Sequence, residues 1–209
     1  MTDSLRSVLW QGLFRPGAEW CELAQENDGW RLSGTALVAV GDEPFAARYD
    51  IALAADWSTR QADIALRTGA EPHERTLRLL ADPAHGWRIE RDPPAPPLPG
   101  DDAAAVHGLI DIDLGFTPAT NTLPIRRLAP AVGAAVDVTA LWVRFPELTI
   151  EPLPQRYTRT SQHRYRYESA GGAFVADLEV DDLGLVVTYE GGWQRIAASP
   201  AAADHGARQ

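Results

Sequence analysis

The chain contains no lysine, and all 19 of its Lys and Arg residues are arginine. This absence excludes Schiff-base and lysine-nucleophile chemistry. A single cysteine, Cys21, excludes an intramolecular disulfide and a cysteine-rich zinc site. No apolar run approaches the roughly 20 residues that a membrane-spanning helix needs. The N-terminus also lacks the apolar segment of a signal peptide and a lipid-attachment cysteine, so we expect a cytoplasmic protein without a transmembrane segment.

Positive charge is also scarce. The formal net charge is -10, which argues against nucleic acid as a partner, since binding phosphates needs a basic face. An acidic surface is likewise repelled by anionic membranes. The 209 residues, 45% of them hydrophobic and 23% charged, are typical of a globular protein with a substantial core.

The dominant local pattern is alternation of apolar and polar residues broken by turn residues, which predicts a mainly β protein. Strands are predicted at residues 30–40, 45–55, 61–68, 76–80, 87–90, 136–145, 155–168, 173–180 and 185–189. Residues 148–153 are flanked by prolines, which suits an edge strand.

The proline-rich run at residues 92–100 is the strongest interruption of this pattern. We interpret it as a stiff surface connection within one domain, because the segment before it has few core residues to close a domain of its own. The sequence therefore predicts a single domain at residues 1–196. Residues 197–209, rich in Ala, Ser, Pro and Gly, are predicted to be a disordered tail.

Polar side chains are densest between residues 111 and 128, in Asp111-Ile-Asp-Leu-Gly-Phe-Thr-Pro-Ala-Thr-Asn-Thr-Leu-Pro-Ile-Arg-Arg-Leu128. Helical signal is confined to this stretch, with Thr117 as N-cap before Pro118, or Thr122 as N-cap before Pro124. Because Pro124 prevents a long uninterrupted helix, one short helix is expected.

The carboxylates and arginines of this stretch allow two interpretations. Asp111 and Asp113 could bind a divalent ion or act as an acid and base pair. Alternatively they cap the following turn or pair with Arg126 and Arg127, since two carboxylates alone make a poor metal site. The arginines could instead clamp an anionic group of a ligand.

The hydroxyl and amide side chains of the stretch, Thr120, Asn121 and Thr122, could bind sugar hydroxyls or satisfy the backbone of an irregular loop. Aromatic side chains elsewhere could stack on sugars or line an acyl groove, although in β proteins they more often form the core. These aromatics are Tyr49, Trp57, Trp142, Tyr157, Tyr165, Tyr167 and Trp193. The five histidines are scattered, and no nucleophilic-serine or phosphate-loop motif is present, so we expect no metal and no cofactor.

The stretch from Asp111 to Leu128 resembles the signature of a bacterial family described as putative glycolipid-binding. The resemblance extends to Tyr49-Asp-Ile51, to Trp142-Val-Arg-Phe-Pro146 and to the segment that ends at Trp193. It implies an antiparallel spiral β-roll wrapped around one short helix. It also implies similarity in shape to lipoprotein and glycolipid carriers, and hence an amphiphilic small-molecule partner, with a glycolipid as the candidate.

Three hypotheses follow. The first is a non-enzymatic protein that binds an amphiphile in a groove of the roll beside residues 111–128. Its candidate ligand-binding residues are Asp111, Asp113, Thr120, Asn121, Thr122, Arg126, Arg127, Tyr49, Trp57, Trp142 and Tyr157. The second is an enzyme acting on a carbohydrate or lipid through Asp111 or Asp113 with Arg126 or Arg127. The third is a structural or interaction module.

Overall fold

The computed structural model describes residues 3–69, 71, 73–82, 84, 86–94, 101–102 and 104–199, and it is mainly β, as the alternation predicts. The first seven strands are β1 (Asp3–Gly12), β2 (Gly17–Glu26), β3 (Gly29–Val40), β4 (Glu43–Ala54), β5 (Thr59–Thr68), β6 (Arg75–Asp82) and β7 (Gly86–Asp92). The remaining elements are β8 (Ile112–Leu114), η1 (Ala119–Asn121), α1 (Thr122–Leu128), β9 (Ala135–Val143), β10 (Ile150–Ser161), β11 (Arg164–Ser169), η2 (Ala170–Gly172), β12 (Phe174–Val180), β13 (Val186–Tyr189) and β14 (Trp193–Ala198).

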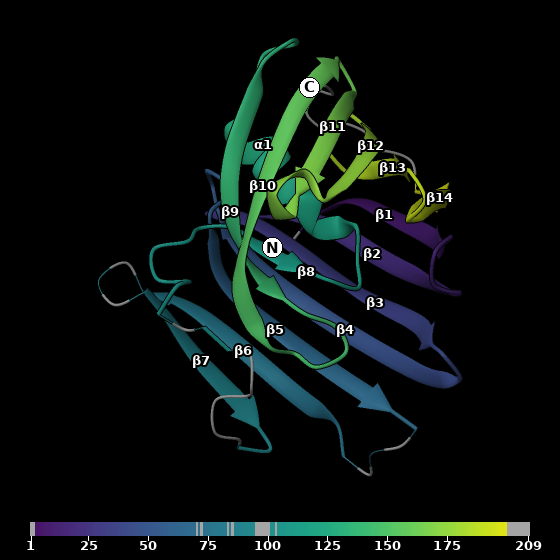
Figure 1. Cartoon of the computed structure of the whole chain (residues 1–209), viewed down its shortest axis with the longest axis vertical. Coiled ribbons are helices and arrows are strands. Elements are labelled where there is room, and N and C mark those ends of the chain that lie inside the picture. Colours follow the sequence, from purple (N-terminus) through teal and green to yellow (C-terminus); the bar gives the residue numbers. More distant parts are fainter. Residues whose placement is uncertain are drawn as a thin grey trace, which may run out of the picture.

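All 14 strands belong to one open sheet, in the order β7-β6-β5-β4-β3-β2-β1-β14-β13-β12-β11-β10-β9-β8. Neighbouring strands are antiparallel except β8 and β9, which are parallel. Pairing of β1 with β14 joins the two halves of the sheet. The sheet bends so that its second half lies across the first, with α1 inside the bend (Figure 1). This is the predicted roll around one short helix.

The core fills the space inside this bend. Alternate residues of β3, β4 and β5 point inward and are buried, as a half-buried strand requires: Leu32, Ala36, Ala47, Ile51, Ile64 and Leu66. Leu123 and Ile125 of α1 are buried in the same cluster. Burying one such side chain contributes about 1.5–3 kcal/mol, so the short helix is held by packing rather than by its own propensity.

The helical segment begins with η1, whose N-cap is Pro118, so neither of the two predicted caps, Thr117 and Thr122, is an N-cap residue. Thr117 Oγ1 accepts a 2.9 Å hydrogen bond from the backbone N–H of Ala119 at the start of η1. Thr122 is the first residue of α1 rather than its N-cap, and its hydroxyl donates to the carbonyl of Gly184 at 3.0 Å. Pro124 lies in the first turn, where a missing N–H breaks no helical hydrogen bond. Within the described residues, no helix is long and apolar enough to cross a membrane.

Strand boundaries differ from the prediction at several places, and the strand predicted at 155–168 is two antiparallel strands, β10 and β11, joined by a turn at residues 162–163. Strands β1, β2, β8 and β14 were not predicted, and β14 includes Ala197 and Ala198, which were assigned to the tail. The predicted edge strand at 148–153 is the beginning of the long β10. That beginning is nevertheless paired on one side only, since β10 pairs with β9 from Ile150 but with β11 only from Gln155. Residues 95–100 of the proline run and 200–209 of the tail lie outside the described residues.

Candidate functional site

A cavity of about 550 Å³ opens between β8, the first half of β10 and the ends of β11 and β12. Its volume is in the range of small-molecule sites. Most of its wall is apolar or aromatic: Phe14, Val38, Leu114, Phe116, Trp142, Leu153, Phe174 and Trp193. Polar side chains also line it: Asp113, which is half-buried, and Thr117, Asn121, Tyr167 and Ser169, which are buried. The cavity is therefore amphipathic.

The start of β10 explains why the sheet leaves room here. Pro152 and Pro154 pair with Leu141 and Thr139 of β9, but neither has an N–H to donate to a strand on the other side. Pairing with β11 accordingly starts only after them. Leu153, between the two prolines, lines the cavity.

Asp113 is the more buried of the two carboxylates that line this cavity, the other being the exposed Glu190. Gln155 Nε2 donates to Asp113 Oδ2 at 2.6 Å and to the Tyr167 hydroxyl at 3.0 Å. Burial raises the pKa of the Asp113 carboxyl to about 6, although the hydrogen bond from Gln155 opposes this shift. No arginine or histidine of the described residues pairs with Asp113. Its carboxylate can therefore accept hydrogen bonds from a ligand.

Asn121 is fixed beside this group. Its side-chain N–H donates to the carbonyl of Pro118 at 3.1 Å, and its Oδ1 accepts from the Tyr157 hydroxyl at 2.9 Å. The Tyr157 ring packs on Tyr167, with 5.1 Å between ring centroids. Because these side chains are buried and held by several partners, the polar part of the cavity is preorganised.

The predicted pair of carboxylates is divided between two environments. Asp111 is completely buried and accepts two hydrogen bonds from Arg127, from Nε at 3.0 Å and from Nη2 at 2.5 Å. Neither residue lines the cavity. For Asp111 the structure matches the alternative of pairing with an arginine, whereas Asp113 faces the cavity.

Other predicted site residues lie away from the cavity. The Arg126 guanidinium is stacked on Trp57, 5.2 Å from the ring centroid, and donates to the carbonyl of Asp182. Thr120 accepts a hydrogen bond from the backbone N–H of Leu114, which completes the loop between β8 and η1. The structure thus brings Asp113, Asn121 and Trp142 together at the cavity, with Tyr157 behind Asn121. The rest are placed elsewhere: Asp111, Thr120, Thr122, Arg126, Arg127, Tyr49 and Trp57.

A second buried polar group surrounds Glu19, which the sequence did not single out. Its Oε1 accepts hydrogen bonds from Tyr49 and from Thr117, each 2.6 Å long. Complete burial raises the pKa of the Glu19 carboxyl to about 8, against the lowering effect of these two hydrogen bonds. Thr117 also lines the cavity, so Glu19 supports the cavity wall from behind.

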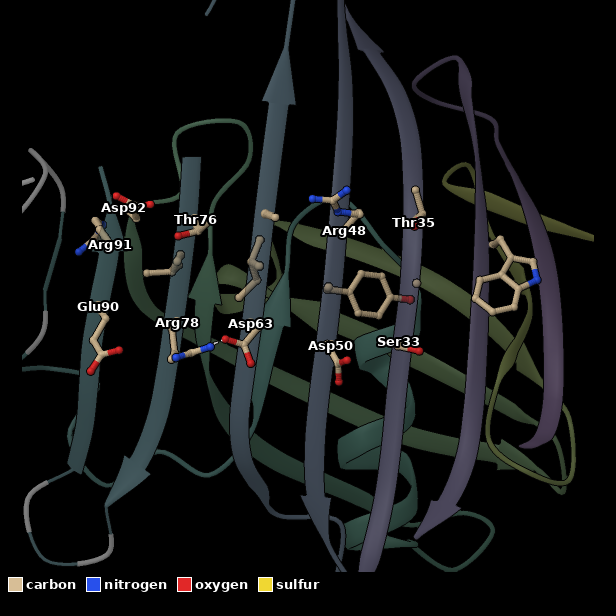
Figure 2. Close-up of a pocket in the computed structure, with 16 residues that line it drawn as sticks. Ser33, Thr35, Arg48, Asp50, Asp63, Thr76, Arg78, Glu90, Arg91 and Asp92 are labelled. Carbon is tan, nitrogen blue, oxygen red and sulfur yellow. Dashed lines mark hydrogen bonds and ion pairs between the residues drawn. The ribbon is translucent and has the colours of Figure 1, made fainter. Parts of the chain in front are cut away.

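The outer face of β2–β7 carries a separate hollow of about 650 Å³, lined by polar side chains from five neighbouring strands (Figure 2). Most of its charged groups are held in ion pairs, as Arg78 is with Asp63 at 2.5 Å. Arg48 is likewise paired with Glu74 at 2.6 Å. Exposed pairs of this kind contribute little to stability and leave little charge for a ligand.

Metal-ligating side chains do not cluster in the part of the chain that the structure describes: no group of three His, Cys, Asp or Glu residues could hold an ion there. Cys21 is buried and free. Burial, together with the neighbouring Glu19, raises the pKa of its thiol. His85 and His205 lie outside the described residues.

Comparison with known proteins gives two matches. The family described as "Putative glycolipid-binding" matches residues 7–195. The crystal structure of a DUF1089 family protein from Pseudomonas aeruginosa is similar, with a TM-score of 0.70 and 33% sequence identity over 85% of this chain and 92% of that chain. No curated protein matches.

Proposed function

Since the chain belongs to the putative glycolipid-binding family, we propose that it binds an amphiphile in the cavity beside β8, as a binding protein rather than an enzyme. The observation that carries this proposal is that the cavity wall has both polar and apolar side chains. Polar side chains lie among its buried residues, and apolar side chains form most of the rest. An amphiphile is the class of molecule whose two ends match such a wall.

The arrangement of the wall favours one orientation of the ligand. Asp113, Asn121 and Tyr167 would receive a hydroxylated headgroup, because a carboxylate, an amide and a phenol can each bind hydroxyls. Phe14 and Phe174 are exposed parts of the wall, and they would contact the beginning of the tail. A volume of about 550 Å³ suits a headgroup with part of a chain, rather than a whole lipid with two long chains.

Binding can be tested with a fluorescent alkyl glycoside on protein stripped of lipid. We expect saturable binding by the wild-type protein and loss of at least tenfold in affinity for Leu153→Trp, whose larger side chain occupies the cavity. Val132→Trp is the matched control, because Val132 is exposed and does not line the cavity. Equal affinity of both variants and the wild type would place binding elsewhere.

One observation favours the enzymatic alternative. The pKa of Asp113, raised to about 6, suits general acid–base catalysis near neutral pH. The predicted partners do not assist it, however, since Asp111 and Arg127 are paired with each other outside the cavity. Incubation with alkyl glycosides and esters, followed by chromatography, separates the two functions. Release of product that Asp113→Asn abolishes would establish the enzyme, and unchanged ligand supports the binding protein.

A further inference from the structure

The rim of the cavity carries large apolar side chains exposed to solvent. Phe14 and Leu13, in the turn between β1 and β2, are 79% and 54% exposed, and Phe174 at the start of β12 is 46% exposed. Phe14 and Phe174 both line the cavity, so its apolar wall continues onto the outer surface. Exposed apolar groups that adjoin a binding site often mark an interaction surface.

The β1–β2 turn is held in this exposed position from both sides. The backbone N–H of Leu13 donates to the carbonyl of Gly192 at 2.8 Å, which places the turn beside the β13–β14 connection (Figure 1). The backbone N–H of Ala39 donates to the carbonyl of Pro16 at 2.9 Å. Two backbone anchors keep Phe14 from folding back onto the protein.

Charge around the turn differs from that of the whole chain. Residues 12–18 contain one arginine, Arg15, and no acidic residue, although the chain has a net charge of -10. Leu37, which is 58% exposed, points to the opposite face of β3 from Val38, which lines the cavity, so it is not part of this rim. Glu190 is the acidic side chain that lines this cavity besides Asp113.

We propose that this rim, made of Leu13, Phe14 and Phe174, docks on the surface of a lipid bilayer with uncharged or zwitterionic headgroups. Exposed apolar and aromatic side chains suit the bilayer interface. Arg15 beside them lies over the Phe145 ring, 5.6 Å from its centroid, and brings no negative charge to the rim. The acidity of the whole chain disfavours an anionic surface. This inference rests on the proposed function, because a ligand entering from the bilayer would pass the rim with its tail on the apolar side chains.

Flotation with phosphatidylcholine vesicles tests docking independently of the cavity. The wild-type protein is expected to float with the vesicles, and the double variant Leu13→Ser/Phe14→Ser to partition about tenfold less, since two large side chains no longer enter the interface. The matched control, Val132→Ser, removes an apolar side chain that is 59% exposed in the α1–β9 connection, and it should float like the wild type. Affinity for a fluorescent alkyl glycoside is measured in parallel, because it reports ligand binding in the cavity without any contribution from docking.

Three outcomes would overturn docking: no flotation of the wild-type protein, equal flotation of the double variant, or flotation that requires anionic phosphatidylglycerol. A dimer in gel filtration that Leu13→Ser/Phe14→Ser abolishes would assign the rim to a second copy of the chain instead. If the glycoside binds but the protein does not float, docking fails while the proposed function stands. If the protein floats but does not bind the glycoside, the proposed function fails.

Discussion

The Tyr49 hydroxyl donates a 2.6 Å hydrogen bond to Glu19 Oε1 across the width of β3. The ring can span this distance because Gly34, paired with Tyr49 on one side and with Cys21 on the other, has no side chain beneath it. The bond ties β4 to β2 inside the roll. It also holds a carboxyl group behind Thr117, at the wall of the cavity.

The first prediction concerns the pH dependence of stability. The folded protein keeps a proton on Glu19 up to a pH of about 8, whereas the unfolded chain loses it above 4.5. The contribution of Glu19 to the free energy of unfolding therefore falls as pH rises between these values, by about 1.4 kcal/mol per unit. Glu19→Gln cannot ionise, so its stability should fall less over this window. Urea unfolding of both proteins at pH 5, 6, 7 and 8 checks this, and parallel curves would contradict it.

The second prediction concerns the close approach at Gly34. A Cβ atom there would lie 2.5 Å from the Tyr49 hydroxyl oxygen and 2.7 Å from the Trp20 carbonyl oxygen. Gly34→Ala should therefore lower the free energy of unfolding by about 1–3 kcal/mol through overpacking. In the control Gly69→Ala, the nearest atom to the new Cβ is 3.8 Å away, and little change is expected. Equal unfolding midpoints for the two variants would refute the argument.

The third prediction separates the adjacent arginines. Arg127→Ala leaves the buried carboxylate of Asp111 without its partner and should cost about 3–5 kcal/mol. Arg126→Ala removes an exposed cation–π contact with Trp57 and should cost no more than about 1 kcal/mol. Chemical denaturation of the two variants measures both values. A reversed order would show that the Asp111–Arg127 pair does not hold β8 to the helix.

The fourth prediction concerns ligand binding. Asp113 ionises as pH rises through about 6, and a carboxylate accepts stronger hydrogen bonds from hydroxyls than a carboxylic acid does. Affinity for an uncharged alkyl glycoside should therefore rise between pH 5 and pH 7, and Asp113→Asn should abolish this rise. Titration by fluorescence at these pH values is the measurement. Affinity that falls over the same interval would contradict a headgroup bound at Asp113.

Much of the fold was predictable because β3–β7 alternate cleanly between apolar and polar residues. Strand β2 was missed for a physical reason: it buries Glu19 and exposes Trp20, the opposite of what hydrophobic patterning assumes. Strand β10 was divided in the prediction because Pro152 and Pro154 interrupt its pattern. They are tolerated there because that end has a partner on one side only.

The candidate site was less predictable. Local density of polar residues located Asp113 and Asn121, but the neighbouring Arg127 and Thr122 serve the packing of the helix. Gln155 and Tyr167, which complete the polar group, are 42 and 54 residues from Asp113 in the sequence, and only the folding of the sheet brings them together. The place of Phe14 at the cavity could not be predicted from the sequence, because isolated apolar residues are common in surface turns.

We expect the cavity beside β8 to bind one amphiphile per chain. Native mass spectrometry tests it most directly, on lipid-free protein exposed to a bacterial lipid extract, with Leu153→Trp and Val132→Trp in parallel. We expect one added lipid mass on the wild type and on Val132→Trp, and none on Leu153→Trp. Bare protein in all three samples, or the same added mass on all three, would contradict it.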